Sequence, residues 1–180
     1  MLIEANRSVL VVIDVQERLT PAMDGLAPLK RNLTTLMRAA ARLDVPMIVT
    51  EQYPKGLGRT VADLAALAPA EAVVEKIEFS AARNDAFNER LAALGRSDPI
   101  ICGIEAHVCV LQTTLDLAER GLITWLVGDA TASRVPASAA AAHARAGRHG
   151  VELVTTEMVL FEWLRRAGTP LFRELSALIR

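Results

Sequence analysis

The sequence predicts an α/β fold, a Rossmann-like, doubly wound, six-stranded parallel sheet with strand order 3-2-1-4-5-6 and helices on both faces. Six short apolar segments alternate with segments of helical periodicity along the 180 residues. Such alternation is typical of a parallel sheet covered by helices on both sides. The right-handed crossover rule then favours a doubly wound order, in which the topological switch point lies between strands 1 and 4.

The first half of the chain carries three of the expected strands, at residues 8–15, 46–50 and 72–75. The run S-V-L-V-V-I-D-V at 8–15 is typical of a strand that is buried on both faces. Residues 26–43 place Leu29, Leu33 and Leu36 on one helical face, which predicts a helix. Thr60 with Asp63 resembles a capping pair for a short helix at 61–67. Asn84 is expected to cap a helix that ends at Leu94.

The second half carries the other three strands, at 99–103, 123–127 and 151–155. A helical pattern begins at Cys109 and runs to about Arg120, with Gly121 as the C-cap candidate. An alanine-rich helix is expected at 136–149, and helices at 157–165 and 170–179 complete the pattern. No linker, repeat or low-complexity tract interrupts the chain, so we expect a single domain over 1–180.

Composition excludes several classes of partner. The net charge is −1 without a run of like charge, so nothing favours nucleic acid or a membrane surface as partner. No apolar run approaches the roughly 18–20 residues of a membrane span, and the N-terminus lacks a signal-peptide core. The two cysteines form neither a disulfide framework nor a zinc spacing. We therefore expect a cytoplasmic protein with reduced thiols.

Three reactive side chains follow strands of the predicted sheet. Asp14 ends strand 1, Lys76 ends strand 3, and Cys109 follows strand 4 on a turn into a helix. The carboxyl ends of these strands share one edge, where open α/β sheets bind ligands. A nearby cation or a helix N-terminus lowers the pKa of a thiol, so we expect a lowered pKa for Cys109. Asp14 could then act as general base for a cysteine nucleophile.

Each residue taken alone also has a structural interpretation. A buried cysteine is often only a small hydrophobic residue, and this interpretation fits Cys102 inside strand 4 better than Cys109. An aspartate at a strand end often caps a turn, and a single lysine is more often solvated than catalytic. The joint placement of Asp14, Lys76 and Cys109 is what favours catalysis.

Several motifs resemble those of the isochorismatase-like cysteine hydrolases. They are V-V-I-D-V-Q at 11–16, E-K-I-E-F-S at 75–80 and G-I-E-A-H-V-C-V at 103–110, with E-Q-Y-P-K-G-L-G at 51–58 and G-D-A-T-A-S-R at 128–134. The resemblance implies Asp14 as general base, Lys76 as the neighbouring cation and Cys109 as the nucleophile of a covalent intermediate. It also implies a cis peptide bond between Ile104 and Glu105, and an oxyanion hole formed by the backbone N–H groups of Glu105 and Cys109.

The departures from the family pattern narrow the chemistry. Nicotinamidases of this superfamily carry an Asp-x-His type metal site after the second strand, whereas residues 51–60 contain no histidine. The three histidines, His107, His143 and His149, come much later, so we expect no metal and no cofactor. Siderophore-type isochorismatases lack the cysteine, so the presence of Cys109 argues against vinyl-ether cleavage.

A small-molecule substrate is expected to lie against residues that follow the strand ends. Tyr53 could instead pack, Phe79 could fill the core, and His107 could be a second base or face away from Cys109. We expect Asp129 and Arg134 to order the loop after strand 5. The candidate substrate-binding residues are Gln16, Leu19, Gln52, Tyr53, Phe79, Ile104 and His107.

The favoured function is hydrolysis of a small amide-like C–N bond by a metal-independent, homo-oligomeric cysteine hydrolase. A non-catalytic binding or assembly module of the same fold is an alternative. A second alternative is a redox sensor in which Cys102 resolves an oxidised Cys109, although a cysteine buried in a strand disfavours that geometry.

Overall fold

The computed structural model describes residues 1–179 and contains the predicted parallel sheet. The strands lie in the order β3-β2-β1-β4-β5-β6, and every neighbouring pair is parallel. The prediction of a doubly wound sheet with order 3-2-1-4-5-6 is therefore confirmed. The strands are β1 (Ser8–Ile13), β2 (Met47–Gln52), β3 (Val73–Lys76), β4 (Asp98–Ile104), β5 (Trp125–Ala132) and β6 (Glu152–Val154).

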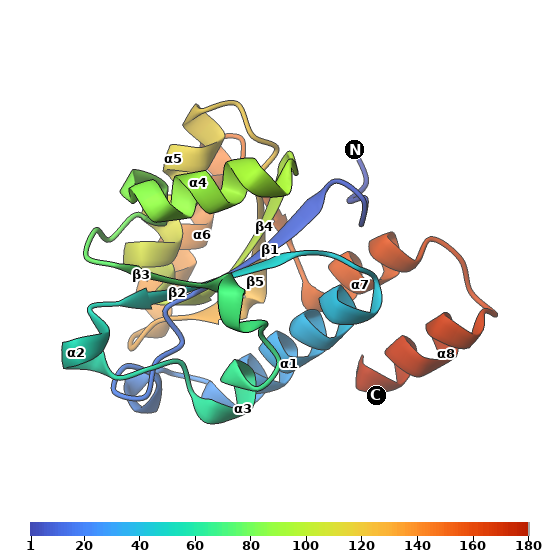
Figure 1. The fold of residues 1–180 in the computed structure, drawn as a ribbon, viewed down its shortest axis with the longest axis horizontal. Coiled ribbons are helices and arrows are strands. Elements are labelled where there is room, and N and C mark those ends of the chain that lie inside the picture. The colour runs from blue at the N-terminus through green and yellow to red at the C-terminus, as the bar shows by residue number, and fades with distance from the viewer. Residues whose placement is uncertain (180) are drawn as a thin grey trace.

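Helices cover both faces of this sheet. In Figure 1, α4, α5 and α6 lie on one side, whereas α1, α3, α7 and α8 lie on the other. The two layers enclose the strands, so only the strand ends and the two edge strands reach the surface. The helices are α1 (Leu26–Arg42), α2 (Pro54–Leu57), α3 (Ala62–Ala65), α4 (Asp85–Leu94), α5 (Leu111–Glu119), α6 (Pro136–Arg148), α7 (Thr156–Leu164) and α8 (Pro170–Ser176).

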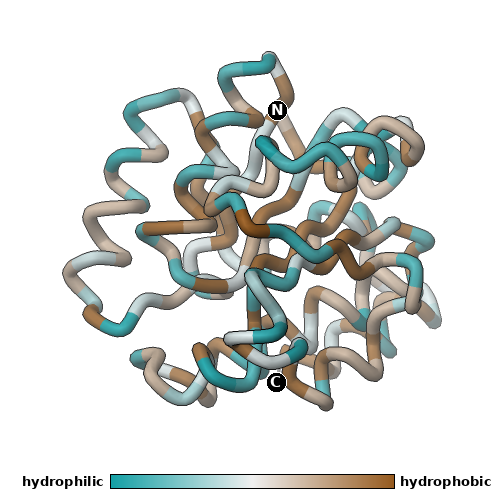
Figure 2. Tube along the Cα trace, turned by 60° about the vertical axis from the view of Figure 1, so that its left-hand side comes forward, coloured by the Kyte–Doolittle hydropathy of each residue, from teal (hydrophilic) through white to brown (hydrophobic). Residues whose placement is uncertain are grey.

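The core consists of two apolar clusters separated by the sheet. Alternate residues of a strand point to opposite faces. Accordingly, Val9, Val11 and Ile13 of β1 pack with the α4–α6 layer, whereas Leu10 and Val12 pack with α1 and α7. Figure 2 shows the apolar segments gathered inside and the hydrophilic ones on the outer loops. A continuous apolar run therefore forms a strand that is buried on both faces, as predicted.

Local differences from the sequence expectations have identifiable causes. The expected Thr60 cap does not form, because the amide and the hydroxyl of Thr60 both donate to the carboxylate of Glu51. Helix α3 is four residues long, Ala62–Ala65, and therefore shorter than the helix expected at 61–67. The helix expected to begin at Cys109 begins at Leu111, and a π-helical turn, Ala106–Val110, precedes it. Asn84 does cap α4, since its side chain accepts a hydrogen bond from the amide of Phe87.

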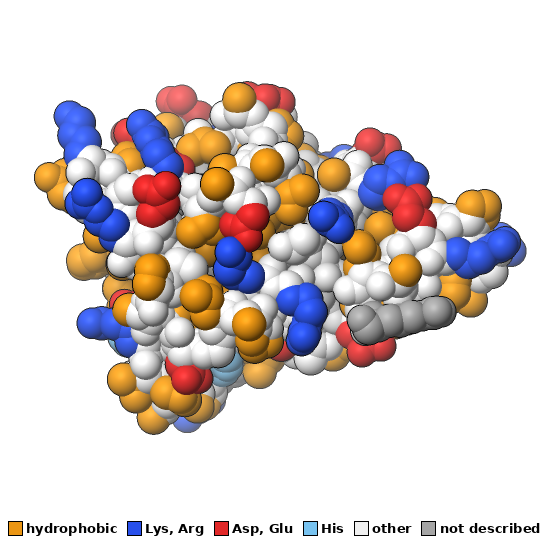
Figure 3. All heavy atoms as spheres, turned by 90° about the horizontal axis from the view of Figure 1, so that it is seen from below, with side chains coloured by type: hydrophobic (Ala, Val, Ile, Leu, Met, Phe, Trp, Pro, Cys, Tyr) orange, Lys and Arg blue, Asp and Glu red, His pale blue; other side chains and the backbone are white. Residues whose placement is uncertain are grey.

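The surface carries charges of both signs. On the face shown in Figure 3, Lys and Arg side chains are interspersed with Asp and Glu, with apolar atoms between them. No helix within residues 1–179 combines the length and the apolar character that crossing a membrane requires.

Candidate active site

Asp14 is fixed immediately beyond the central strand β1. Its backbone adopts a left-handed conformation, with φ of 51°, which aspartate tolerates better than most residues. The side chain is fully buried, and its Oδ1 accepts a 2.6 Å hydrogen bond from the hydroxyl of Thr50 on β2. The second carboxylate oxygen, Oδ2, remains for another partner.

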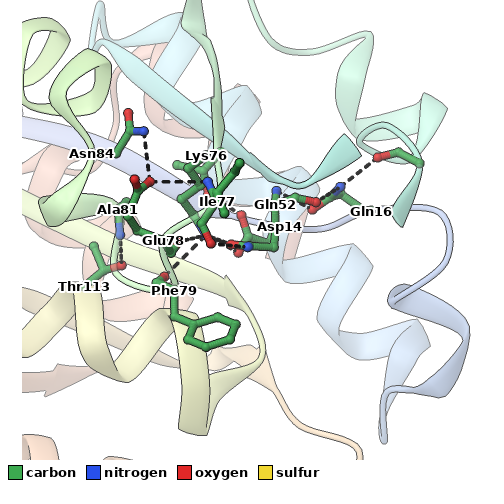
Figure 4. Close-up of polar contacts among 12 residues, drawn as sticks. Asp14, Gln16, Gln52, Lys76, Ile77, Glu78, Phe79, Ala81, Asn84 and Thr113 are labelled. Atoms are coloured by element: carbon green, nitrogen blue, oxygen red, sulfur yellow. Dashed lines mark hydrogen bonds and ion pairs between the residues drawn. The ribbon is translucent and has the colours of Figure 1, made fainter. Parts of the chain in front are cut away.

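Lys76 supplies that partner from the end of β3. Its Nζ lies 2.7 Å from Asp14 Oδ2 and 2.7 Å from Gln52 Oε1, and both charged side chains are fully buried. The backbone carbonyls of Glu78 and Phe79 lie 3.2 and 3.3 Å from the same nitrogen. A buried ion pair needs such additional hydrogen bonds to compensate for the loss of hydration. Figure 4 shows Lys76, Gln52 and Asp14 converging at this point.

The Cys109 thiol interacts with both members of this pair. The pKa of the thiol is raised to about 12. Burial is the largest cause and the negative charge of Asp14 acts in the same direction, whereas the Lys76 ammonium lowers the pKa. The expectation of a lowered pKa for Cys109 is therefore wrong, because desolvation and the carboxylate outweigh the ammonium. The resting group is a neutral thiol, and its attack on a carbonyl requires a base.

The turn that carries Cys109 begins at the end of β4. The peptide bond between Ile104 and Glu105 is cis, as the resemblance implies. The carbonyl oxygen of Glu105 accepts hydrogen bonds from the amides of Val108 and Val110. Within residues 1–179, neither the Glu105 amide nor the Cys109 amide donates to a carbonyl outside the turn. The two amides expected to form an oxyanion hole are thus not committed to a carbonyl elsewhere in the described chain.

The two glutamines expected near the substrate form hydrogen bonds with other residues of the protein. Gln16 is fully buried, and its amide nitrogen donates to the carbonyls of Gln52 and Gly58. Its Oε1 accepts from the amide of Gln52. The Gln52 side chain in turn donates to the carbonyl of Ile77 and accepts from Lys76. The structure therefore brings Gln52 to the Lys76–Asp14 pair, whereas Gln16 links the end of β2 at Gln52 to the loop at Gly58.

The other expected substrate neighbours differ in how accessible they are. Tyr53 and Phe79 are 53% and 57% exposed beside the end of β3. Tyr53 also lines a cavity of about 440 Å³ that reaches Lys76 but does not include Asp14 or Cys109 among its lining residues. Ile104 is fully buried on the α1 side of the sheet, where the partly buried Leu19 also packs. A contact between these two side chains and a substrate stays a prediction.

Residues around the loop after β5 form contacts that the sequence did not predict. His107 places Nδ1 2.9 Å from the hydroxyl of Ser133. Asp129 lies within β5, and its carboxylate accepts from the amide and the hydroxyl of Thr156 at the start of α7. Arg134 forms an ion pair with Glu105 at 3.0 Å. Ser133 and Arg134 thus connect the loop after β5 to the turn after β4, whereas Asp129 belongs to β5 and connects that strand to α7, so it does not lie in the loop that it was expected to order.

Thr50 is the site residue that sequence reasoning missed. The sequence pattern indicates only that it is the last residue of strand 2. A single polar residue at the end of an apolar strand was the available signal, because the parallel register places Thr50 opposite Ile13, the residue before Asp14.

The part of the chain that the structure describes contains no group of three or more His, Cys, Asp or Glu side chains arranged to hold a metal ion. Glu51 is the first acidic residue of the segment in which nicotinamidases carry their metal site. Its carboxylate instead accepts hydrogen bonds from Thr60 and from Arg59, whose NH1 lies 2.8 Å away. Burial opposes ionisation of Glu51, but the hydrogen bonds from Thr60 and Arg59 prevail and lower its pKa. The guanidinium of Arg59 thus neutralises this carboxylate.

Comparison with known proteins gives the family. The isochorismatase domain model matches residues 8–158. Isochorismatase domain-containing protein 2 of Danio rerio is 38% identical, over 96% of this chain and 86% of its own length. The MAR1 ribonuclease structure from Caenorhabditis elegans superposes with a TM-score of 0.92 at 36% identity, covering 99% of this chain and 92% of that one. YcaC from Pseudomonas aeruginosa, solved with hexane-2,5-diol and covalent acrylamide, gives a TM-score of 0.91 at 25% identity, covering 98% and 91%. The chain therefore belongs to the isochorismatase family.

Proposed function

We propose that this chain is a metal-independent cysteine hydrolase that cleaves a small amide-like C–N bond. The observation that carries the proposal is the fully buried Lys76–Asp14 ion pair acting on the thiol of Cys109. Burying a charged pair costs desolvation free energy that a pair of apolar residues would not cost. Its presence here therefore favours a chemical role over a purely stabilising one. A neutral thiol beside a carboxylate is the arrangement that a base-assisted nucleophile requires.

The reaction follows from these positions. Asp14 accepts the thiol proton while sulfur attacks the substrate carbonyl carbon, and the carbonyl electron pair moves onto oxygen. The amides of Glu105 and Cys109 donate to this oxyanion. When the tetrahedral species collapses, the C–N bond breaks and the departing nitrogen takes the proton from Asp14, which leaves a thioester on Cys109.

Hydrolysis of the thioester completes the cycle. Asp14 removes a proton from water, and the resulting hydroxide attacks the thioester carbonyl. The C–S bond breaks, the thiolate recovers its proton from Asp14, and a carboxylic acid leaves. Throughout the cycle Lys76 holds the Asp14 carboxylate in place and balances its charge. The substrate has been split into an acid and an amine at the expense of one water molecule.

The relatives support a nucleophilic thiol and do not identify the substrate. The Pseudomonas aeruginosa YcaC structure contains covalent acrylamide. Acrylamide is an amide-bearing electrophile that reacts with thiolates, so we extend to this chain the expectation of a reactive cysteine beside an amide-binding site. The Caenorhabditis elegans protein is described as a ribonuclease. Metal-free RNA cleavage by this chain that persists in a Cys109→Ala variant would count against our proposal.

Labelling and turnover test the proposal together. Acrylamide or iodoacetamide should modify Cys109 in the folded protein, as read by peptide mass spectrometry. Cys109→Ala should abolish hydrolysis across a panel of small amides and imides, with the circular dichroism spectrum unchanged. Cys102→Ala is the matched control and should retain both labelling and turnover. Labelling of Cys102 instead, together with an active Cys109→Ala protein, would refute the assignment.

The same panel of amides and imides distinguishes a hydrolase from a non-catalytic binding module. A non-catalytic binding module would bind a panel compound tightly without any turnover, even when Cys109 is alkylated readily. We further propose that the protein is a homo-oligomer that acts on a small molecule. Supporting this proposal, Ile77 and Phe79 beside the site are 75% and 57% exposed, more than a monomer of this kind needs to leave in water.

A further inference from the structure

The turn that carries the nucleophile is anchored from outside by the loop after β5. Glu105, the residue that precedes the turn, has a largely buried side chain with 11% exposure. Its Oε2 accepts from the backbone amide of Arg134 at 3.2 Å and from Arg134 Nε at 3.0 Å. The Arg134 side chain is 61% exposed, so one face of the guanidinium stays in water while Nε contacts the turn.

A second contact joins the same two segments. His107, two residues into the turn, is hydrogen-bonded through Nδ1 to the hydroxyl of Ser133. Ser133 is 1% exposed, and its carbonyl accepts from the amide of Asp24 in the loop after β1. The pair Ser133–Arg134 is therefore itself fixed to the rest of the molecule, and it holds two points of the turn on either side of Ala106.

The position of this anchor relative to the reacting groups gives it a function. The backbone amide of Glu105 is one of the two proposed oxyanion donors, and its side chain is what Arg134 holds. Lys76, Asp14 and Gln52, by contrast, contact neither Ser133 nor Arg134 through any described hydrogen bond within residues 1–179. The anchor therefore reaches the proposed oxyanion donors by a route that bypasses Asp14, Lys76 and Gln52.

We propose that Arg134, assisted by Ser133, is a positioning residue that sets the oxyanion donors through Glu105. This inference rests on the proposed function. Loss of the Arg134 side chain leaves the base and the thiol in place but lets the Glu105 amide move away from the developing negative charge. Misplacement of a catalytic group by about 1 Å can cost about a hundredfold in rate, so the consequence is measurable.

Two alkylating agents separate oxyanion stabilisation from thiol reactivity. When a thiolate adds to the β-carbon of acrylamide, the C=C electron pair moves through the α-carbon onto the carbonyl oxygen, and the resulting enolate is protonated at the α-carbon. When a thiolate displaces iodide from iodoacetamide, the C–S bond forms as the C–I bond breaks, and no charge develops on the amide oxygen. The ratio of the two rates at Cys109 therefore reports on the donors.

In the full-length protein, Arg134→Ala should lower the ratio of acrylamide to iodoacetamide rates by about tenfold or more. Arg134→Lys should recover part of the loss, because an ammonium can still pair with Glu105. Arg42→Ala is the matched control, since Arg42 forms an exposed ion pair with Glu174 on the α1 side of the sheet. That control should leave the ratio unchanged.

The outcomes distinguish failure of the positioning role of Arg134 from failure of the proposed hydrolase function. If Arg134→Ala leaves the ratio unchanged, or slows both agents equally, the positioning role is wrong although Cys109 is reactive. If wild-type Cys109 reacts with neither agent, the proposed function itself fails. For any amide that turns over, Arg134→Ala should lower kcat with little change in KM, whereas an Arg134 that binds a substrate carboxylate would raise KM.

Discussion

The thiol of Cys109 experiences two opposing charges at close range. Asp14 favours the protonated thiol, and Lys76 favours the thiolate. Because burial acts in the same direction as Asp14, the thiol keeps its proton at neutral pH. In the mechanism we propose, this arrangement links reactivity to proton transfer, since the thiolate forms only when Asp14 takes the proton. A permanently ionised cysteine would react with any electrophile that entered the site.

Substitution of Asp14 should therefore separate alkylation from catalysis. Asp14→Asn removes a negative charge that raises the thiol pKa, so the pKa of Cys109 should fall and the thiolate fraction at neutral pH should rise. Each unit of decrease increases that fraction about tenfold. We expect faster reaction with iodoacetamide, a pH–rate profile displaced to lower pH, and loss of amide turnover.

The opposite substitution provides the control. Lys76→Met removes the charge that lowers the thiol pKa, so it should slow iodoacetamide labelling and displace the pH–rate profile to higher pH.

The Asp14→Asn variant should keep the geometry of the wild type, because Thr50 can still donate to the amide oxygen of the Asn side chain. Slower labelling of Asp14→Asn than of wild type would show that Asp14 does not oppose ionisation of the thiol.

The elements differ in how well the sequence predicts them. The six strands and their order follow from apolar runs and the crossover rule, because a buried parallel strand leaves an unmistakable pattern. The sequence G-D-A-T-A, which follows the fifth strand, instead indicates a turn. In the structure β5 continues through it to Ala132, since Thr131 and Ala132 pair with Gly103 and Ile104 of β4. Pairing with a neighbouring strand overrides a local turn preference.

The features of the candidate site also differ in whether the sequence predicts them. Asp14, Lys76 and Cys109 could be proposed as site residues because Asp14 and Lys76 end strands of the predicted sheet and Cys109 lies on the turn after strand 4. The acceptors around the Lys76 ammonium could not be identified, since two of them are backbone carbonyls whose position depends on the path of the chain after β3. The pKa of Cys109 was also inaccessible, because it depends on how deeply the folded chain buries the thiol.

Gly103 sets the distance between the two strands that carry Asp14 and Cys109. Its φ is +112°, and a Cβ on this residue would collide with the backbone of Ile13 on β1. Gly103→Ala should therefore separate β4 from β1 and lower the free energy of unfolding by about 3 kcal/mol or more, as measured by urea denaturation. Cys109 should also lose its preferential labelling in whatever fraction folds.

The matched control for this substitution is Gly95→Ala. Gly95 also has a positive φ, of 60°, but nothing lies within 4 Å of a Cβ placed there. Gly95→Ala should therefore lower the free energy of unfolding by only about 1 kcal/mol, the cost of placing alanine in a left-handed backbone conformation. Equal stability of the two variants would mean that the close approach of β4 to β1 is not what requires a glycine at position 103.

At the scale of the whole molecule, the sheet divides the two cysteines. Cys102 packs in the cluster that faces α1 and α7, whereas Cys109 packs in the cluster that faces α4, α5 and α6. Cys102 is fully buried, burial raises its pKa, and its sulfur lies 3.6 Å from the carbonyl oxygen of Val11. A disulfide between them would need a path through a closed layer of strands, which argues against the redox-sensor alternative.

Peroxide treatment of the folded protein should therefore produce no bridge between Cys102 and Cys109. The expected products are unmodified protein and, at high peroxide, oxidation confined to Cys109, because Cys109 has some solvent exposure (7%) whereas Cys102 has none. Non-reducing peptide mapping measures both products. In urea the barrier disappears with the sheet, so the same treatment should then give the bridge and prove that the assay can detect it. A bridge formed without urea, with the circular dichroism spectrum unchanged, would mean that the two thiols can meet without unfolding, and it would favour the redox sensor over the hydrolase.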